Sequence, residues 1–209
     1  MEKSIRIVYK GCETEKIIEK SRFLTFSKHV ESEEGAREFI ASVRSKHSMA
    51  THVCYAFVAD KIGNLQRFSD DGEPQGTAGI PMLEVLKAKK LFETAVVVVR
   101  YFGGVKLGAG GLVRAYSSCV AENLDCADIR TLETCVEYTV TVEYTGIDGI
   151  QKYLSSKSCS LLSTDYGENV KFLIAVKKKE SERFCSELID FMQGKVKVEQ
   201  GKEYYSAFQ

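Results

Sequence analysis

The sequence predicts an α+β protein made of two domains, residues 1–131 and 132–209. A length of 209 residues is enough for one large domain or two small ones. Both prolines and half of the 16 glycines fall in residues 72–111, so the first part contains long glycine-containing loops. Residues 133–203 instead show the order β-α-β-β-α-β with short connections, which is typical of a ferredoxin-like domain.

The first part of the chain combines strand and helix patterns. Alternating or continuous apolar residues predict strands at three places: residues 5–7, 22–30 and 51–59. Between the last two, apolar residues at helical spacing follow Ser32, a residue type that favours the N-terminal cap of a helix. Residues 60–79 are rich in turn formers and predict a long loop. Pro81 suits the first turn of a helix that runs to about Leu91.

The middle of the chain contains the most distinctive strand. Residues 95–101 (AVVVVRY) form a continuous β-branched run, which is typical of a central strand buried on both faces. A glycine-rich loop at 103–111 then leads into a helix whose apolar residues share one face. The second domain is predicted to contain, in order, β 133–144, α 147–156, β 159–165, β 168–178, α 181–193 and β 195–203.

Composition and charge exclude several broad classes of protein. Basic and acidic side chains both number 29, so the chain as a whole is not a strongly basic nucleic-acid binder. The longest apolar run, Ala95 to Val99, is far too short to cross a membrane, and residues 1–20 contain no signal-peptide core. The seven cysteines are odd in number and form no C-x-x-C pair, so we expect seven free thiols and a cytoplasmic location.

Residues 67–81 (RFSDDGEPQGTAGIP) carry three carboxylates within four positions, at Asp70, Asp71 and Glu73. A long irregular loop in a compact domain usually has a function of its own. The carboxylates could form a solvated turn, hold a divalent cation through oxygen ligands, or shape a partner-binding loop together with Arg67. An arginine within salt-bridge distance of them would favour an internal network over a metal site.

The glycines of residues 103–111 (GGVKLGAGG) lie between a buried strand and a helix, where backbone N–H groups form a ready anion site. Residues 87–114 contain six basic side chains and one acid, a local charge of +5. The expected phosphate-contacting residues are Arg100, Gly103, Gly104, Lys106, Gly108, Gly110, Gly111 and Arg114, with Lys87, Lys89 and Lys90 as a supporting rim. The alternative is a tight strand–helix contact that needs small residues. No Gly-Lys-Ser/Thr follows, so this is not a Walker A loop.

His52 and Cys54 share one face of a predicted strand and could suggest a thiol nucleophile with its base. Neighbours two apart on a strand rarely form such a pair, and no third orienting group is evident. A partly buried structural histidine is therefore favoured. The sequence contains no recognisable catalytic order or metal-ligand motif, so we expect no catalytic residues and no metal ligands.

Three segments resemble the signature of the IMPACT/YigZ family: ATHVCYAF at 50–57, RFSDDGEPQGTAGIPM at 67–82, and VRYFGGVKLGAGGLVRA at 99–115. The resemblance covers about residues 18–125, and the remainder is similar to the small C-terminal domain of bacterial members. It implies that the first domain has the fold of the second domain of a small-subunit ribosomal protein, which is also that of elongation factor G domain four. It implies a ferredoxin-like second domain similar to domain five of that factor. Those two domains engage ribosomal RNA.

The basic segment, the glycine-rich helix start and the resemblance together predict a function in translation. We expect a cytoplasmic, translation-associated regulatory factor that binds RNA or the ribosome without catalysis. No cofactor and no membrane association are expected, and the default assembly is a monomer. Two alternatives stay open. One is a regulator that acts through a protein partner, as eukaryotic relatives do. The other is a nucleotide- and magnesium-dependent small-molecule enzyme, or a peptidase, as some family members are labelled.

Overall fold

The computed structural model describes residues 4–206. The chain divides into two compact units: Ile5–Thr131 is the first, and the described part of Leu132–Gln209 belongs to the second. Each unit has its own sheet, with two apolar clusters in the first unit and one in the second. No helix among the described residues is long and apolar enough to cross a membrane.

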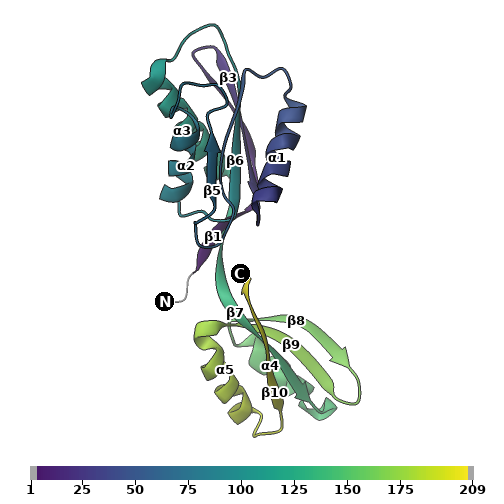
Figure 1. Cartoon of the computed structure of the whole chain (residues 1–209). Helices are drawn as coiled ribbons and strands as arrows, with labels where there is room; N and C mark the ends of the chain where they lie inside the picture. Colours follow the sequence, from purple (N-terminus) through teal and green to yellow (C-terminus); the bar gives the residue numbers. More distant parts are fainter. Residues whose placement is uncertain (1–3, 207–209) are drawn as a thin grey trace. The chain divides into compact units, whose positions relative to one another are not determined.

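The first unit is a three-layer α/β/α arrangement (Figure 1). Its elements are β1 (Ile5–Lys10), β2 (Glu13–Ile18), β3 (Ser21–His29), α1 (Glu33–Lys46), β4 (His52–Val58), β5 (Gln66–Ser69), α2 (Gly79–Ala88), β6 (Thr94–Tyr101) and α3 (Gly108–Cys126). The sheet has the strand order β2-β3-β6-β4-β5, and every neighbouring pair is antiparallel. The helix α1 covers one face, and α2 and α3 cover the other.

The central strand β6 explains why the unit has two cores. Its side chains alternate, so that Val96 and Val98 pack beneath α2 and α3 while Val97 and Val99 pack beneath α1. All its residues except Tyr101 are buried, which confirms the prediction of a strand buried on both faces. The predicted cap of α1 is also confirmed, because the Ser32 side chain accepts a hydrogen bond from the Gly35 N–H.

The second unit has the predicted ferredoxin-like order. Its elements are β7 (Asp128–Val142), a short 3₁₀ turn (Tyr144–Gly146), α4 (Ile147–Ser155), β8 (Cys159–Tyr166), β9 (Val170–Lys177), α5 (Lys178–Phe191) and β10 (Lys197–Ser206). The antiparallel strands lie in the order β10-β7-β9-β8. Alternate residues of β7 and β9 pack against Ile150 of α4 and Leu188 of α5. The strand β7 begins five residues earlier than predicted, at Asp128.

The expectation of seven free thiols is wrong. Cys12 and Cys126 form a disulfide with a Cα–Cα distance of 6.1 Å, which joins the start of β2 to the end of α3. The Asn123 amide strengthens the same junction, because it donates to the carbonyls of Cys12 and Thr25 at 2.9 Å each. The free cysteines are Cys54, Cys119, Cys135, Cys159 and Cys185. The cysteines therefore no longer argue for a reducing compartment.

The disulfide can be tested by counting thiols. Denatured, non-reduced protein should react with five equivalents of a thiol reagent, and reduced protein with seven. Because the bond closes a long loop, its reduction should lower the free energy of unfolding by about 2–4 kcal/mol in denaturant titrations. A count of seven before reduction would contradict the assignment.

Candidate functional site

A buried ion pair lies where β4, β6 and α3 meet. The Arg100 Nη1 donates to Glu73 Oε1 at 2.7 Å, and both side chains are at most 4% exposed. The Tyr116 hydroxyl donates to the same carboxylate oxygen at 2.7 Å, and Arg100 Nη2 donates to Ser21 Oγ at 3.1 Å. Removing two charges from water costs several kcal/mol per ion, so such a pair is stable only when further hydrogen bonds complete it.

The sheet register brings these groups together. His52 begins β4 directly opposite Arg100 near the end of β6. Its Nδ1 lies 2.8 Å from the Asp71 carbonyl, and its Nε2 lies 3.8 Å from Glu73 Oε2. The guanidinium also lies over the ring of Phe23, at 5.3 Å from the centroid. The Glu73 carboxylate is thus surrounded by side chains from β4, β6 and α3.

The other two carboxylates of the loop also have internal partners. Asp70 accepts hydrogen bonds from three backbone N–H groups at the start of α2: those of Gly76, Ala78 and Gly79. The Asp71 carboxylate accepts from the Arg44 guanidinium at 2.8 Å and from the Val53 N–H at 2.6 Å. Burial raises the pKa of Asp71, but these donors outweigh burial and hold that pKa below its usual range. An internal network is therefore favoured over a cation site at Asp70, Asp71 and Glu73.

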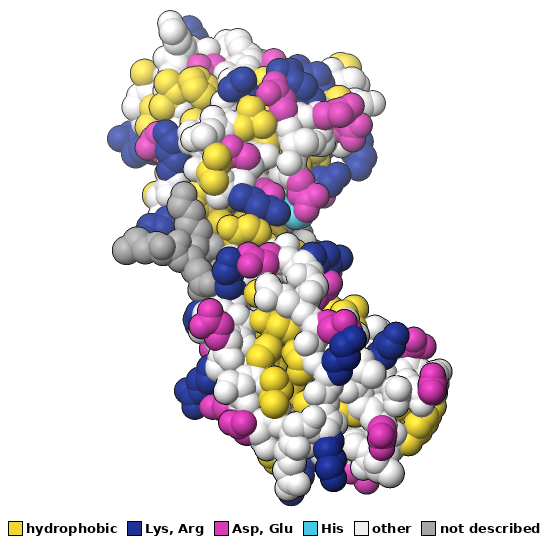
Figure 2. Space-filling view, turned by 60° about the horizontal axis from the view of Figure 1, so that its bottom comes forward, with side chains coloured by type: hydrophobic (Ala, Val, Ile, Leu, Met, Phe, Trp, Pro, Cys, Tyr) yellow, Lys and Arg dark blue, Asp and Glu magenta, His cyan; other side chains and the backbone are white. Residues whose placement is uncertain are grey.

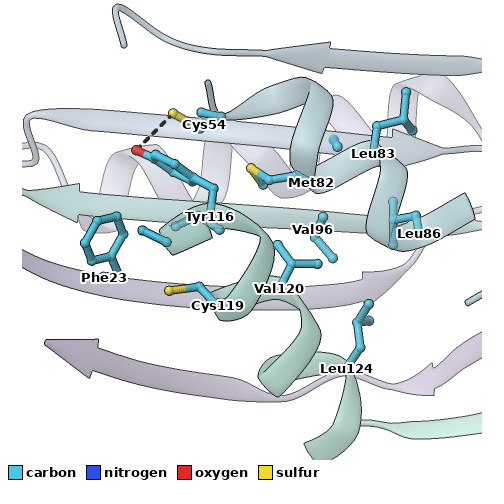
Figure 3. Packing of buried hydrophobic residues seen from close by; sticks show 14 of the residues in the cluster. Phe23, Cys54, Met82, Leu83, Leu86, Val96, Tyr116, Cys119, Val120 and Leu124 are labelled. Carbon is cyan, nitrogen blue, oxygen red and sulfur yellow. Dashed lines mark hydrogen bonds between the residues drawn. The ribbon is translucent and has the colours of Figure 1, made fainter. Parts of the chain in front are cut away.

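Cys54 belongs to this network as a neutral thiol. Its Sγ lies 3.0 Å from the Asp70 carbonyl and 3.4 Å from the Tyr116 hydroxyl (Figure 3). Burial raises the pKa of the Cys54 thiol to about 12, and burial also raises the pKa of Tyr116. Because the thiolate is the nucleophilic form, Cys54 does not form the nucleophile–base pair considered for His52.

Tight packing explains some glycines of the 103–111 segment. A Cβ on Gly103 would lie 1.9 Å from the backbone oxygen of Lys20, so only glycine fits beside the β2–β3 turn. A Cβ on Gly111 would lie 3.1 Å from Leu107 Cβ, which is tight but less severe. The strand–helix packing alternative therefore holds for Gly103 and in part for Gly111.

The remaining glycines face open space. A Cβ on Gly104, Gly108 or Gly110 would meet nothing within 4 Å. Gly104 and Gly108 have φ values of +85° and +68°, a conformation that favours glycine. Neither reason applies to Gly110, which is the third residue of α3. No side chain caps the α3 N-terminus, so these residues form an exposed stretch of backbone at a helix start.

The basic residues of the 87–114 segment do not form one surface. Lys106 and Arg114 are exposed beside the α3 N-terminus and form no ion pair with another residue of the range 4–206. Lys89 instead pairs with Asp125 near the other end of α3. Gly108 and Asp125 are seventeen residues apart, which is about 25 Å along a helix.

Two expectations about phosphate contacts are consequently wrong. Arg100 is 4% exposed and is paired with Glu73, so it is not a surface contact. Lys87, Lys89 and Lys90 follow one another at the end of α2 and do not form a rim around the glycine loop; Lys87 pairs with Glu84. Arg67 is exposed, and its guanidinium lies 3.8 Å from Glu33, a residue outside the carboxylate loop.

The sequence did not reveal three residues that contact the ion pair or the glycine-rich segment. Tyr116 and Ser21 are buried polar partners of the ion pair. Tyr116 packs among the apolar residues of α3, and in the sequence its hydroxyl alone indicates a polar partner. Lys20 is exposed in the turn that packs on Gly103, more than 80 residues away in sequence, and no local pattern indicates this proximity.

One protein-family model matches a stretch of the chain that includes both the carboxylate loop and the glycine-rich segment. The model of the Impact N-terminal domain matches residues 19–124, more than half of the chain. This chain belongs to the IMPACT family. A second model, a domain of unknown function (DUF1949), matches residues 140–195. The resemblance seen in the three sequence segments is thereby confirmed.

Individual IMPACT family members align over nearly the whole chain. The protein is 40% identical over 193 residues to the IMPACT family member YvyE of Bacillus subtilis, which covers 92% of this chain and 89% of that relative. It is 39% identical over 183 residues to YigZ of Escherichia coli, covering 87% and 90%. A crystal structure of a hypothetical protein aligns with a TM-score of 0.62 and 37% identity, over 95% of this chain and 97% of that one.

Substitution of Arg100 tests the buried network. Arg100→Met leaves the Glu73 carboxylate buried without its cation, so the free energy of unfolding should fall by about 3–5 kcal/mol in urea titrations. The double variant Glu73→Gln with Arg100→Met should recover part of that loss, because no uncompensated charge remains. Arg67→Ala, an exposed arginine beside the same loop, is the control and should change stability by less than about 1 kcal/mol. A double variant less stable than Arg100→Met alone would contradict the ion-pair account.

Proposed function

We propose that this IMPACT family protein is a cytoplasmic, translation-associated regulatory factor that binds RNA or the ribosome without catalysis of its own. The binding site is the glycine-rich surface, which we define as Gly104, Lys106, Gly108, Gly110 and Arg114. Phosphate oxygens accept hydrogen bonds from the backbone N–H groups of the first turn of α3, and the two basic side chains provide charge.

The observation that carries this proposal is Gly110. Neither packing nor backbone conformation explains a glycine at this position. A residue without a side chain lets an external backbone approach the helix start closely, as phosphate-binding loops require. An uncapped N-terminus with a helix dipole and two exposed cations is the environment in which an anion is most stable.

A neighbouring aromatic residue favours nucleic acid over a small anion. Phe102 precedes the glycines and is 46% exposed. An exposed ring beside a phosphate site can stack on an unpaired base, which contributes about 1–3 kcal/mol in single-strand binding proteins. The resemblance to the ribosome-contacting domains of elongation factor G also favours nucleic acid as the ligand, by analogy between folds.

The charge distribution favours attraction of RNA by a few local side chains over attraction by the net charge of the protein. Net charge is zero, and Figure 2 shows Lys and Arg side chains interspersed with Asp and Glu over the visible face. Binding would then depend on a few positioned contacts, with a weak salt dependence. The absence of catalysis is supported by the neutral Cys54 thiol and by the internal partners of Asp70, Asp71 and Glu73.

Charge reversal provides the test. Two phosphate contacts on a single strand should lower affinity about fivefold for a threefold rise in salt. The double variant Lys106→Glu with Arg114→Glu should abolish that dependence and most of the binding, measured by fluorescence anisotropy with ribosomal RNA fragments and by co-sedimentation with ribosomes. Lys87→Glu is the matched control, since it changes the charge of the same segment at the far end of α2.

Gly110→Ala separates binding from folding. Alanine should stabilise α3 by up to about 1 kcal/mol, yet weaken RNA binding because its methyl group obstructs the close approach. Wild-type protein without salt-dependent binding to RNA or ribosomes would refute the proposal. So would a Lys87→Glu variant that is impaired as much as the double variant.

A further inference from the structure

Three side chains of metal-binding types lie close together at the end of β6 that is remote from Arg100. His29 ends β3, Glu31 follows it before α1, and Glu93 immediately precedes β6. One ligand atom from each of the three lies within 4.8 Å of the others. Glu93 and Arg100 are seven residues apart on an extended chain, about 23 Å, so this group is separate from the network around Glu73.

The backbone holds the two supporting segments together. The Val30 N–H donates to the Glu93 carbonyl at 2.8 Å, and His29 pairs with Thr94 in the β3–β6 register. Glu93 has a φ of +46°, a conformation that is uncommon for a residue with a side chain. Such conformations persist where surrounding structure fixes them, and they concentrate at binding sites. The three side chains therefore project from a fixed frame rather than from a free loop.

The buried carboxylate of Glu93 is compensated only by long contacts. Its side chain is 4% exposed, and its side-chain partners among the described residues are His29 Nε2 at 3.3 Å and Lys61 Nζ at 3.8 Å. Neither distance is that of a short charge-assisted hydrogen bond. Glu73, at the other end of the strand, has comparable burial but an arginine and a tyrosine both at 2.7 Å. The two ion pairs of Glu93 are longer than the contacts of Glu73, and a directly bound metal ion would compensate its buried charge more closely.

We propose that His29, Glu31 and Glu93 bind one divalent transition-metal cation of the zinc or manganese class. One imidazole nitrogen and two carboxylates form a mixed donor set that suits these ions, whereas magnesium and calcium prefer oxygen ligands alone. The buried Glu93 carboxylate is the ligand on the interior side of the site. Glu31 is exposed and His29 is half-buried, so the remaining coordination positions face water. Lys61 Nζ pairs with the Glu93 carboxylate at 3.8 Å, and the metal cation takes the place of this ammonium beside the carboxylate.

Metal titration of the full-length protein tests the site. After treatment with EDTA and its removal, calorimetry with Zn²⁺ and electron paramagnetic resonance with Mn²⁺ should each show one equivalent bound. Affinity for Mg²⁺ should be roughly tenfold weaker or more. Manganese is included because it does not favour the thiolates of the free cysteines.

Variants at the surface of the site avoid disturbing the fold. Glu31→Gln and His29→Asn should each weaken binding of both ions by roughly tenfold or more. Glu34→Gln, an exposed glutamate three residues further on, is the matched control and should bind as the wild type does. Absence of Zn²⁺ and Mn²⁺ binding up to millimolar concentration would overturn the proposal. Unchanged affinity in Glu31→Gln and His29→Asn would also overturn it, because the ion would then be held elsewhere.

Discussion

The carboxylate of Glu73 constrains the first unit more than any other group. It accepts hydrogen bonds from Arg100 on β6 and from Tyr116 on α3, and His52 of β4 lies beside it. A buried charge cannot exchange such partners for water without a cost of several kcal/mol. The carboxylate loop, the end of the central strand and the first turns of α3 must therefore stay together. The exposed start of α3 is positioned as a consequence.

This constraint separates residues that support the site from residues that face outward. The conspicuous basic segment maps to three places: Arg100 in the interior, Lys106 and Arg114 beside the α3 N-terminus, and Lys87 to Lys90 near the opposite end of that helix. The glycines divide in the same way. Gly103 is required by the carbonyl of Lys20, whereas a Cβ added to Gly110 would meet nothing within 4 Å. Gly110 is the outward-facing glycine that neither packing nor backbone conformation explains, and the proposed function rests on it.

Local patterns predicted much of the fold. The β-branched run at 95–101 identified the central strand, and the alternation of strand and helix patterns identified the ferredoxin-like order of the second unit. Long-range pairs were not predictable, since no local pattern joins Cys12 to Cys126 or Glu73 to Tyr116. The motifs identified the loops around the candidate site in part, because residues 66–69 of the predicted 60–79 loop form β5. They could not distinguish Arg100 from Arg114, because charge in a sequence does not reveal whether a side chain points inward or outward.

Hydrogen–deuterium exchange of the wild-type protein, with and without ribosomal RNA, tests the central claim most directly. Amide exchange reports which backbone N–H groups become protected on binding. The account predicts slower exchange at residues 104–114 when RNA is present, and unchanged exchange at residues 87–90. Protection that is confined to the second unit, or that is equal at both ends of α3, would contradict the assignment of the glycine-rich surface.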